Sequence, residues 1–212
     1  MIAIIDYNAG NLKSVQLALE AIGAECCITM EREEIQNAEK IIFPGVGAAG
    51  KAVEDLRRLG LDQALKSAFA ELKPIMGICL GAQIILDESE ENKAQCLGLI
   101  NGRVKRLPHP LFSENGARLK IPHMGWNGLH LLKKHPVMKG LAPSDEFYFV
   151  HSYYTVPASR EHVIGTTDYG IEFASVIGIR NLIAMQFHPE KSGEPGLRML
   201  ENFCSWDGRY AE

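Results

Sequence analysis

Short apolar runs alternate with amphipathic segments along the first half of the chain. Residues 2–5 form an apolar run, residues 8–11 have turn chemistry, and residues 12–22 place apolar side chains at helical spacing before Gly23. The same order returns as a run at 40–43, helical spacing over 53–70, a run at 74–79 and a helix over 80–86. Short strands alternating with helices predict a mostly parallel sheet with helices on both faces.

The pattern changes beyond residue 95, where Gly, Pro and His become frequent. Apolar runs there predict partly antiparallel strands at 146–150, 164–166, 173–177 and 182–187, and a closing helix at 197–203. We find no linker, low-complexity tract or internal repeat between the two halves. We therefore expect one α/β domain over residues 1–212, with a mixed, mostly parallel central sheet of flavodoxin-like type.

The composition excludes several classes of protein. With 212 residues, 46% hydrophobic and 23% charged, the chain is long enough to bury one substantial core. A net charge of -4 provides no basic field, so we do not expect nucleic acid as a partner. No segment approaches the ~18 apolar residues of a membrane span, and the opening MIAIID lacks the basic flank and length of a signal peptide.

The cysteines and glycines indicate no bound metal or cofactor. The cysteine count is odd and no CxxC pair is present, so neither a disulfide framework nor a zinc site is predicted. A reducing, cytoplasmic location fits this pattern best. The stretch GVGAAG at 45–50 imitates a nucleotide-binding loop but lacks the acidic partner of a dinucleotide-binding unit.

Cys79 stands where a predicted strand runs into a predicted helix, between Gly77 and Gly81. This spacing resembles a nucleophile elbow, in which a strained turn lifts the nucleophile clear of the sheet and only glycine fits beside it. A thiol over a helix N-terminus also favours the thiolate. The sequence therefore predicts Cys79 as the reactive cysteine. A small buried hydrophobe is the alternative, and it is our interpretation of the other four cysteines.

His188 and Glu190 stand two residues apart in the stretch QFHPEKSG. Pro189 favours an extended conformation at His188, and residues i and i+2 of an extended segment point to the same side. An imidazole can take the thiol proton and return it to leaving ammonia, while a carboxylate orients the ring. The pair thus predicts the base and its orienting acid, although a structural histidine is the common alternative.

The order GICLGAQ followed by FHPE resembles the class I glutamine amidotransferases, which hydrolyse glutamine through a cysteine, histidine and glutamate triad. The resemblance covers essentially the whole chain and implies that triad in Cys79, His188 and Glu190. Within the class, five stretches are similar to the glutaminase subunit that serves histidine biosynthesis: IIDYNAGNLKSV, PGVG, IPHMGWN, YFVHSYY and FHPEKSG.

Attack by Cys79 on a carboxamide develops an oxyanion, which preorganised backbone N–H groups stabilise. The N–H of Leu80 is one candidate donor, and the loop of Gly45, Val46 and Gly47 after a predicted strand would supply the second. Glycine on both sides of Val46 would let the Gly45–Val46 peptide rotate its N–H into the site, and we hypothesise that this gates activity. A plain strand-to-helix turn is the alternative.

Gln83 lies four residues after Cys79 on one helical face, where its amide could meet the substrate. The resemblance also places Glu91 and the stretch His151, Ser152 and Tyr153 around glutamine. A carboxylate suits the α-ammonium group, and backbone or hydroxyl groups suit the α-carboxylate. Taken alone, Glu91 belongs to the acidic run 87–91, which is typical of a solvated helix end.

The resemblance implies a heterodimer with a (βα)8-barrel cyclase that receives the ammonia through its barrel. Ammonia released into neutral water becomes ammonium, which is not a nucleophile, so docking would protect the product. By the same analogy we expect Asn11, Trp126, Tyr148 and Lys191 at the interface. Trp126 fits the aromatic enrichment of interface hot spots, and a core position is its alternative.

Three other functions stay open. The first is a sister glutaminase subunit for anthranilate, aminodeoxychorismate or pyridoxal phosphate synthesis, against which IPHMGWN and HPEKSG speak. The second is a stand-alone amide hydrolase with the same triad, active at full rate without a partner. The third is a non-catalytic redox-sensing α/β module in which Cys79 is oxidised and His188 and Glu190 are dispensable.

Overall fold

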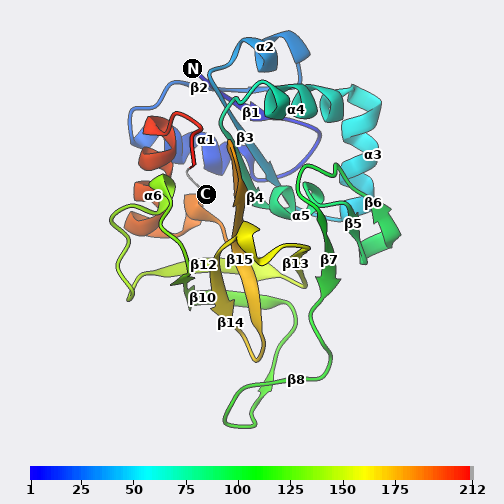
Figure 1. Ribbon diagram of the computed structural model, residues 1–212, viewed down its shortest axis with the longest axis vertical. Coiled ribbons are helices and arrows are strands. Elements are labelled where there is room, and N and C mark those ends of the chain that lie inside the picture. The colour runs from blue at the N-terminus through cyan, green and yellow to red at the C-terminus, as the bar shows by residue number, and fades with distance from the viewer. Residues whose placement is uncertain (211–212) are drawn as a thin grey trace.

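The computed structural model describes residues 1–210 of the chain (Figure 1). The helices are α1 (Leu12–Ala21), α2 (Arg32–Asn37), α3 (Ala49–Leu59), α4 (Leu61–Ala70), α5 (Leu80–Ile84) and α6 (Gly193–Ser205). The strands are β1 (Ile2–Ile5), β2 (Cys26–Thr29), β3 (Lys40–Gly45), β4 (Ile75–Cys79), β5 (Glu88–Ser89), β6 (Ala94–Gln95), β7 (Gly102–Arg106), β8 (Leu111–Phe112), β9 (Arg118–Leu119), β10 (His123–Gly128), β11 (His130–Leu131), β12 (Glu146–His151), β13 (Tyr153–Pro157), β14 (Val163–Asp168), β15 (Glu172–Ile179) and β16 (Leu182–Met185). Short 3-10 helices are η1 (Glu91–Lys93), η2 (Pro136–Met138), η3 (Arg160–His162) and η4 (Pro189–Lys191).

The main sheet runs in the order β2-β1-β3-β4-β16-β15-β13-β7-β5-β6. Outside this order, β14 pairs with β15 on one side and with β11 on the other. Its first five strands pair in parallel, whereas β16, β15, β13 and β7 pair antiparallel. Strands β10 and β12 form a separate antiparallel ribbon beside the sheet. The prediction of a mixed, mostly parallel central sheet with helices is confirmed. A single domain stays a prediction, which the sheet shared by both halves supports.

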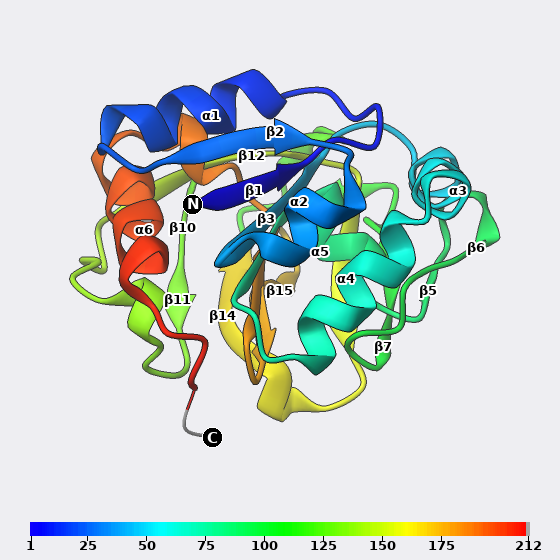
Figure 2. The ribbon, with the colours of Figure 1, turned by 90° about the horizontal axis from the view of Figure 1, so that it is seen from above.

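Two hydrophobic cores lie on opposite faces of the sheet, because successive side chains of a strand point to opposite sides. In β1, Ala3 and Ile5 join the core under helices α2 to α5, whereas Ile2 and Ile4 join the core under α1 and α6. Figure 2 shows α1 and α6 on one side and α3 and α4 on the other. The carboxyl ends of β3 and β4 therefore emerge between two layers of helices.

Several predicted boundaries are wrong for identifiable reasons. The helical spacing over 53–70 continues through a break at Gly60, whose φ of 69° is left-handed, so the segment forms two helices. The predicted helix over 80–86 ends at Ile84. The acidic run 87–91 holds β5 and the start of η1, so it is not a helix end. Within residues 1–210, no helix has the length and apolarity needed to cross a membrane.

Candidate active site

Cys79 ends β4 and precedes α5 in a strained conformation. Its φ of 54° and ψ of -105° lie outside the regions that non-glycine residues favour. A Cβ at Gly77 would lie 2.9 Å from the Cβ of Ala184 on β16, and a Cβ at Gly81 would overlap the carbonyl oxygen of Phe43 on β3. Side chains are thus excluded on both sides of the cysteine, as an elbow requires.

The Cys79 sulfur lies 4.0 Å from the Val150 carbonyl oxygen and 3.8 Å from the amide nitrogen of Gln186. Gln186 donates to the sulfur, which favours negative charge there. Gln186 directly precedes the FH pair but was not among the predicted site residues. Cys79 itself is only 7% exposed, so its reactive face opens into one pocket.

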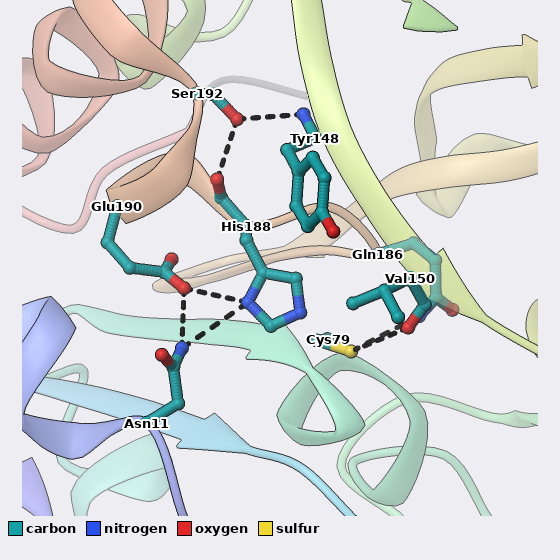
Figure 3. A network of polar contacts seen from close by, with 8 residues as sticks. All are labelled: Asn11, Cys79, Tyr148, Val150, Gln186, His188, Glu190 and Ser192. Carbon is teal, nitrogen blue, oxygen red and sulfur yellow. Dashed lines mark hydrogen bonds and ion pairs between the residues drawn. The ribbon is translucent and has the colours of Figure 1, made fainter. Parts of the chain in front are cut away.

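His188 and Glu190 form a buried pair next to Cys79. The distance from His188 Nδ1 to Glu190 Oε1 is 2.7 Å, and the side chains are 1% and 0% exposed. Figure 3 shows the imidazole ring between the carboxylate and the Cys79 sulfur. Because Nδ1 donates to the carboxylate, the opposite nitrogen Nε2 faces the thiol, and it has no hydrogen-bond partner within residues 1–210. The predicted triad residues are therefore brought together.

The main chain around His188 is fixed by Ser192. The Ser192 hydroxyl donates to the His188 carbonyl oxygen at 2.6 Å and accepts from the Tyr148 N–H at 3.0 Å. His188 is extended, with φ of -104° and ψ of 94°, but Pro189 to Lys191 form η4. The expectation of an extended segment is thus correct at His188 and wrong at Glu190, which the 3-10 turn carries back to the ring.

The pKa of His188 reflects these neighbours. Burial by itself would lower the pKa, but the Cys79 sulfur and the Glu190 carboxylate outweigh it and raise the pKa to about 10. An imidazolium is therefore favoured at neutral pH. A positive ring beside a sulfur stabilises a thiolate, which is the nucleophilic form of cysteine.

A pocket of about 310 Å³ opens beside the Cys79 sulfur. Its wall holds all five residues expected to contact glutamine, Gln83, Glu91, His151, Ser152 and Tyr153, and three of the four expected oxyanion residues, Val46, Gly47 and Leu80. Pro122 and Val150 also line it and were not predicted. The volume suits a ligand the size of an amino acid.

Gln83, Glu91 and His151 are among the pocket residues that already bond to protein groups, and the bonds of His151 are described below. Gln83 Nε2 donates to the Tyr153 carbonyl oxygen at 3.0 Å and to Gln186 Oε1 at 3.1 Å, so only its amide oxygen is left for a ligand. Glu91 Oε2 accepts from the Ala49 N–H at 2.7 Å, at the start of α3. Its negative charge nevertheless lies at the pocket wall, where it suits an ammonium group.

The predicted oxyanion loop follows β3 directly. Val46 is 39% exposed and Gly47 has a φ of 100°, which a residue with a side chain rarely adopts. Gly45 is buried, and a Cβ there would overlap the hydroxyl oxygen of Tyr7 and lie 3.1 Å from the Leu80 Cβ. The Tyr7 hydroxyl is itself buried and has no hydrogen-bond partner within residues 1–210. The loop is thus tightly packed at Gly45 and open at Val46.

The four predicted interface residues lie in different surroundings. Trp126 is 54% exposed on β10, so its alternative as a core residue is wrong, and it contacts the half-buried Tyr148 with ring centroids 6.0 Å apart. Lys191 is exposed. Asn11 is half-buried and donates to Glu190 Oε1 at 2.6 Å, which gives it a contact with the triad. Their place in an interface stays a prediction.

Comparisons with known proteins agree with this geometry. The model of the family Glutamine amidotransferase class-I matches residues 3–205. The chain belongs to this family. Imidazole glycerol phosphate synthase subunit HisH of Nitratidesulfovibrio vulgaris (strain Hildenborough) is 49% identical over 96% of this chain and 95% of its own length. The HisH subunit of Dehalococcoides mccartyi (strain CBDB1) is 47% identical over 96% of both chains.

Solved structures share the fold of this class I glutamine amidotransferase at low sequence identity. A crystal structure described as a glutamine amidotransferase has a TM-score of 0.73 at 19% identity and covers 96% of this chain and 99% of its own. The structure of PurLQS from Thermotoga maritima has a TM-score of 0.73 at 17% identity, covering 96% and 97%. The agreement of family, relatives and fold identifies the chain as an amidotransferase enzyme.

Proposed function

We propose that this chain is the glutaminase subunit of imidazole glycerol phosphate synthase, and that it hydrolyses glutamine to glutamate and ammonia at Cys79. The observation that carries the proposal is the buried pair of His188 and Glu190 beside a strained cysteine, at the edge of a pocket of amino-acid size. The HisH name of the curated relatives favours this subunit over those of the sister amidotransferases.

Each residue of the triad has its own role in the reaction. The Cys79 thiolate attacks the glutamine carboxamide carbon, while the His188 imidazolium gives its Nε2 proton to the leaving ammonia. Glu190 holds the ring through Nδ1 and stabilises its charge. Backbone N–H groups at Leu80 and in the Gly45–Val46–Gly47 loop stabilise the oxyanion. Water then attacks the thioester, with the neutral His188 as base, and glutamate leaves.

The pocket orients glutamine by its charged end. Glu91 receives the α-ammonium group, and the main chain of Ser152 and Tyr153 receives the α-carboxylate. The first assignment follows from the charge of Glu91, the second from the ability of backbone N–H groups to donate to a carboxylate, and both from the position of these residues on the pocket wall. They leave the side-chain carboxamide to point at the Cys79 sulfur.

The ammonia passes to a (βα)8-barrel cyclase subunit that makes imidazole glycerol phosphate and AICAR. The partner docks on the face that carries Trp126 and Tyr148, where exposed Met124 adds a further apolar side chain. Aromatic and methionine side chains are enriched in interface cores. We place the complex in the cytoplasm, which the five free cysteines support.

Glutamine hydrolysis by the purified chain, alone and mixed with the cyclase and its ribonucleotide substrate, tests the proposal. We expect low activity alone, a sharp rise in the mixture and loss in Cys79→Ala, measured as glutamate released. Full activity without the partner would indicate a stand-alone hydrolase. Activity that survives Cys79→Ala would refute the assigned nucleophile.

A further inference from the structure

A chain of buried hydrogen bonds ends at the glutamine pocket and contains His123, which the mechanism above does not use. His151 Nδ1 lies 2.8 Å from the Tyr153 carbonyl oxygen, and His151 Nε2 lies 3.0 Å from His123 Nδ1. His123 Nε2 lies 3.3 Å from the amide nitrogen of Asn127. His123 and His151 are opposite each other in the pairing of β10 with β12.

The partners fix the tautomer of each ring. A carbonyl oxygen only accepts, so His151 must carry its proton on Nδ1 and its Nε2 must accept. His123 must therefore donate from Nδ1, and its Nε2 accepts from the Asn127 amide. All four ring nitrogens are satisfied when both rings are neutral.

Packing holds the His123 ring in the orientation that this donation needs. The ring is 2% exposed and lies between two aromatic rings, Phe149 at 4.8 Å and 18° and Tyr169 at 3.8 Å and 19°. Two stacked faces prevent the ring from turning out of its plane. The donor nitrogen consequently stays aimed at His151.

The consequence reaches the pocket through Tyr153. Both nitrogens of His151 are engaged, so its ring is not free to bind glutamine, although it lines the pocket. Its Nδ1–H instead shares the Tyr153 carbonyl oxygen with Gln83 Nε2. These two donors, from β12 and α5, fix the Tyr153–Tyr154 peptide and thereby the main chain that runs from Ser152 through Tyr153 along the pocket wall.

We infer that His123 is a positioning residue for the glutamine pocket: it sets the tautomer of His151, whose ring holds the Tyr153 carbonyl and with it the glutamine-binding main chain. The inference rests on the proposed function, because it assigns the pocket to glutamine. It changes the expected role of His151 from a ligand of glutamine to a support of the main chain that binds glutamine.

Two substitutions separate the donor from the stack. His123→Phe keeps a planar ring between Phe149 and Tyr169 but removes the donor, whereas His123→Asn keeps an N–H near the Nδ1 position but removes the stack. His135→Phe is the matched control, because His135 is also buried among aromatic rings but lies outside the pocket. Each is made in the full chain and studied in the complex with the cyclase.

The first readout is glutamine binding and turnover. We expect His123→Phe to raise the KM for glutamine about 3- to 10-fold, the effect of one lost hydrogen bond, with kcat changed less than about twofold. His123→Asn should recover most of the KM, and His135→Phe should leave it unchanged. Calorimetry with L-glutamine in a Cys79→Ala background measures the same effect without turnover.

The second readout is the tautomer of His151, from long-range ¹H–¹⁵N correlation spectra of the full chain. We expect a proton on Nδ1 in the natural chain and in His123→Asn, and a mixture of tautomers in His123→Phe. An unchanged tautomer and unchanged KM in His123→Phe would overturn the inference. Absence of glutamine binding in Cys79→Ala would instead refute the proposed function, and the spectra would then decide the histidine assignment alone.

Discussion

Histidines at two places around the pocket differ in protonation at neutral pH, because their neighbours shift their pKa values in opposite directions. His188 lies beside a carboxylate and a sulfur, and its pKa is raised to about 10. His151 and His123 pack against aromatic rings, and burial is the largest cause that lowers the pKa of His151 to about 3 and that of His123 to about 4; the positive charge of His188 lowers the pKa of His151 further. Burial acts in the same direction at both places, so the charged partners decide which histidine holds a proton.

Removing the charge of Glu190 tests the triad side of this comparison and has the largest expected effect. Gln in place of Glu190 can still accept from His188 and Asn11, but it does not stabilise an imidazolium. We expect kcat for glutamine hydrolysis to fall roughly 10²- to 10⁴-fold, measured in the complex with the cyclase. Glu194→Gln, an exposed change on the first turn of α6, is the control. A decrease below about twofold would contradict the role of Glu190.

The triad side could be predicted from sequence because its signals are local. Gly77, Cys79 and Gly81 fall within five residues, and His188 and Glu190 within three. The strain at the elbow and the crowding by Phe43 and Ala184 arise from neighbouring strands. The two glycines are the sign of this crowding in the sequence, because a side chain at either position would overlap these neighbours.

His123, the partner of His151, could not be predicted in the same way, because the pattern of apolar and polar residues on β10 is inverted. On β10 the apolar Met124 and Trp126 are exposed, whereas the polar His123 is buried. A prediction that puts the apolar residues of a strand on its buried face therefore assigns the wrong face of β10 to the core. The contacts of His123 with His151 and Tyr169 span 28 and 46 residues, and no spacing rule connects them. The break at Gly60 was missed for a related reason, since apolar spacing continues across it.

Acid should destabilise the protein through its neutral buried histidines, which include His135 outside the pocket as well as His123 and His151. His123, His135 and His151 have folded pKa values of about 4, 4 and 3, below an unfolded value near 6.5, and burial is the first cause of each shift. Between those values the unfolded chain binds protons that the native chain does not. Stability is therefore full above about pH 6.5 and is lost as pH falls toward about 4, by about 3 kcal/mol for one such histidine.

Urea denaturation of the chain between pH 7.5 and 4.5 measures this loss. The slope of the free energy of unfolding against pH reports the number of protons taken up on unfolding. His135→Asn should lower that number by nearly one, whereas His130→Gln, an exposed change on β11, should leave it unchanged. His188 contributes with the opposite sign, since its raised pKa gives stability that is lost as pH rises through about 10. A free energy of unfolding that stays constant from pH 6.5 to 4.5 would contradict neutral buried histidines.

Truncating Trp126 tests whether the inverted face of β10 is a docking surface. Because its ring is 54% exposed, Trp126→Ala should change the free energy of unfolding by no more than about 0.5 kcal/mol. The Kd for the cyclase should rise about 10- to 100-fold, as expected for an aromatic hot spot. Phe112→Ala, at a 49% exposed residue on β8, is the control for loss of an exposed ring. Equal Kd values for both variants would place the interface elsewhere.

The smallest effect concerns Tyr7 and Gly45, which are packed against each other at the start of the predicted oxyanion loop. Gly45→Ala alone would force its methyl group against the Tyr7 hydroxyl and should cost about 1–3 kcal/mol of stability. Tyr7→Phe removes a buried hydroxyl that has no partner within residues 1–210, so it should leave stability unchanged or raise it by up to about 1 kcal/mol. The double variant should recover part of the loss, and urea denaturation of all four chains gives the coupling.

Glutaminase stimulation by the cyclase substrate is then compared between Tyr7→Phe and the double variant. These two chains differ in the rotational freedom of the Gly45–Val46 peptide, and in both of them the overlap with the Tyr7 hydroxyl is absent. Equal stimulation in both would contradict a rotating peptide, since alanine restricts that rotation whether or not the hydroxyl is present.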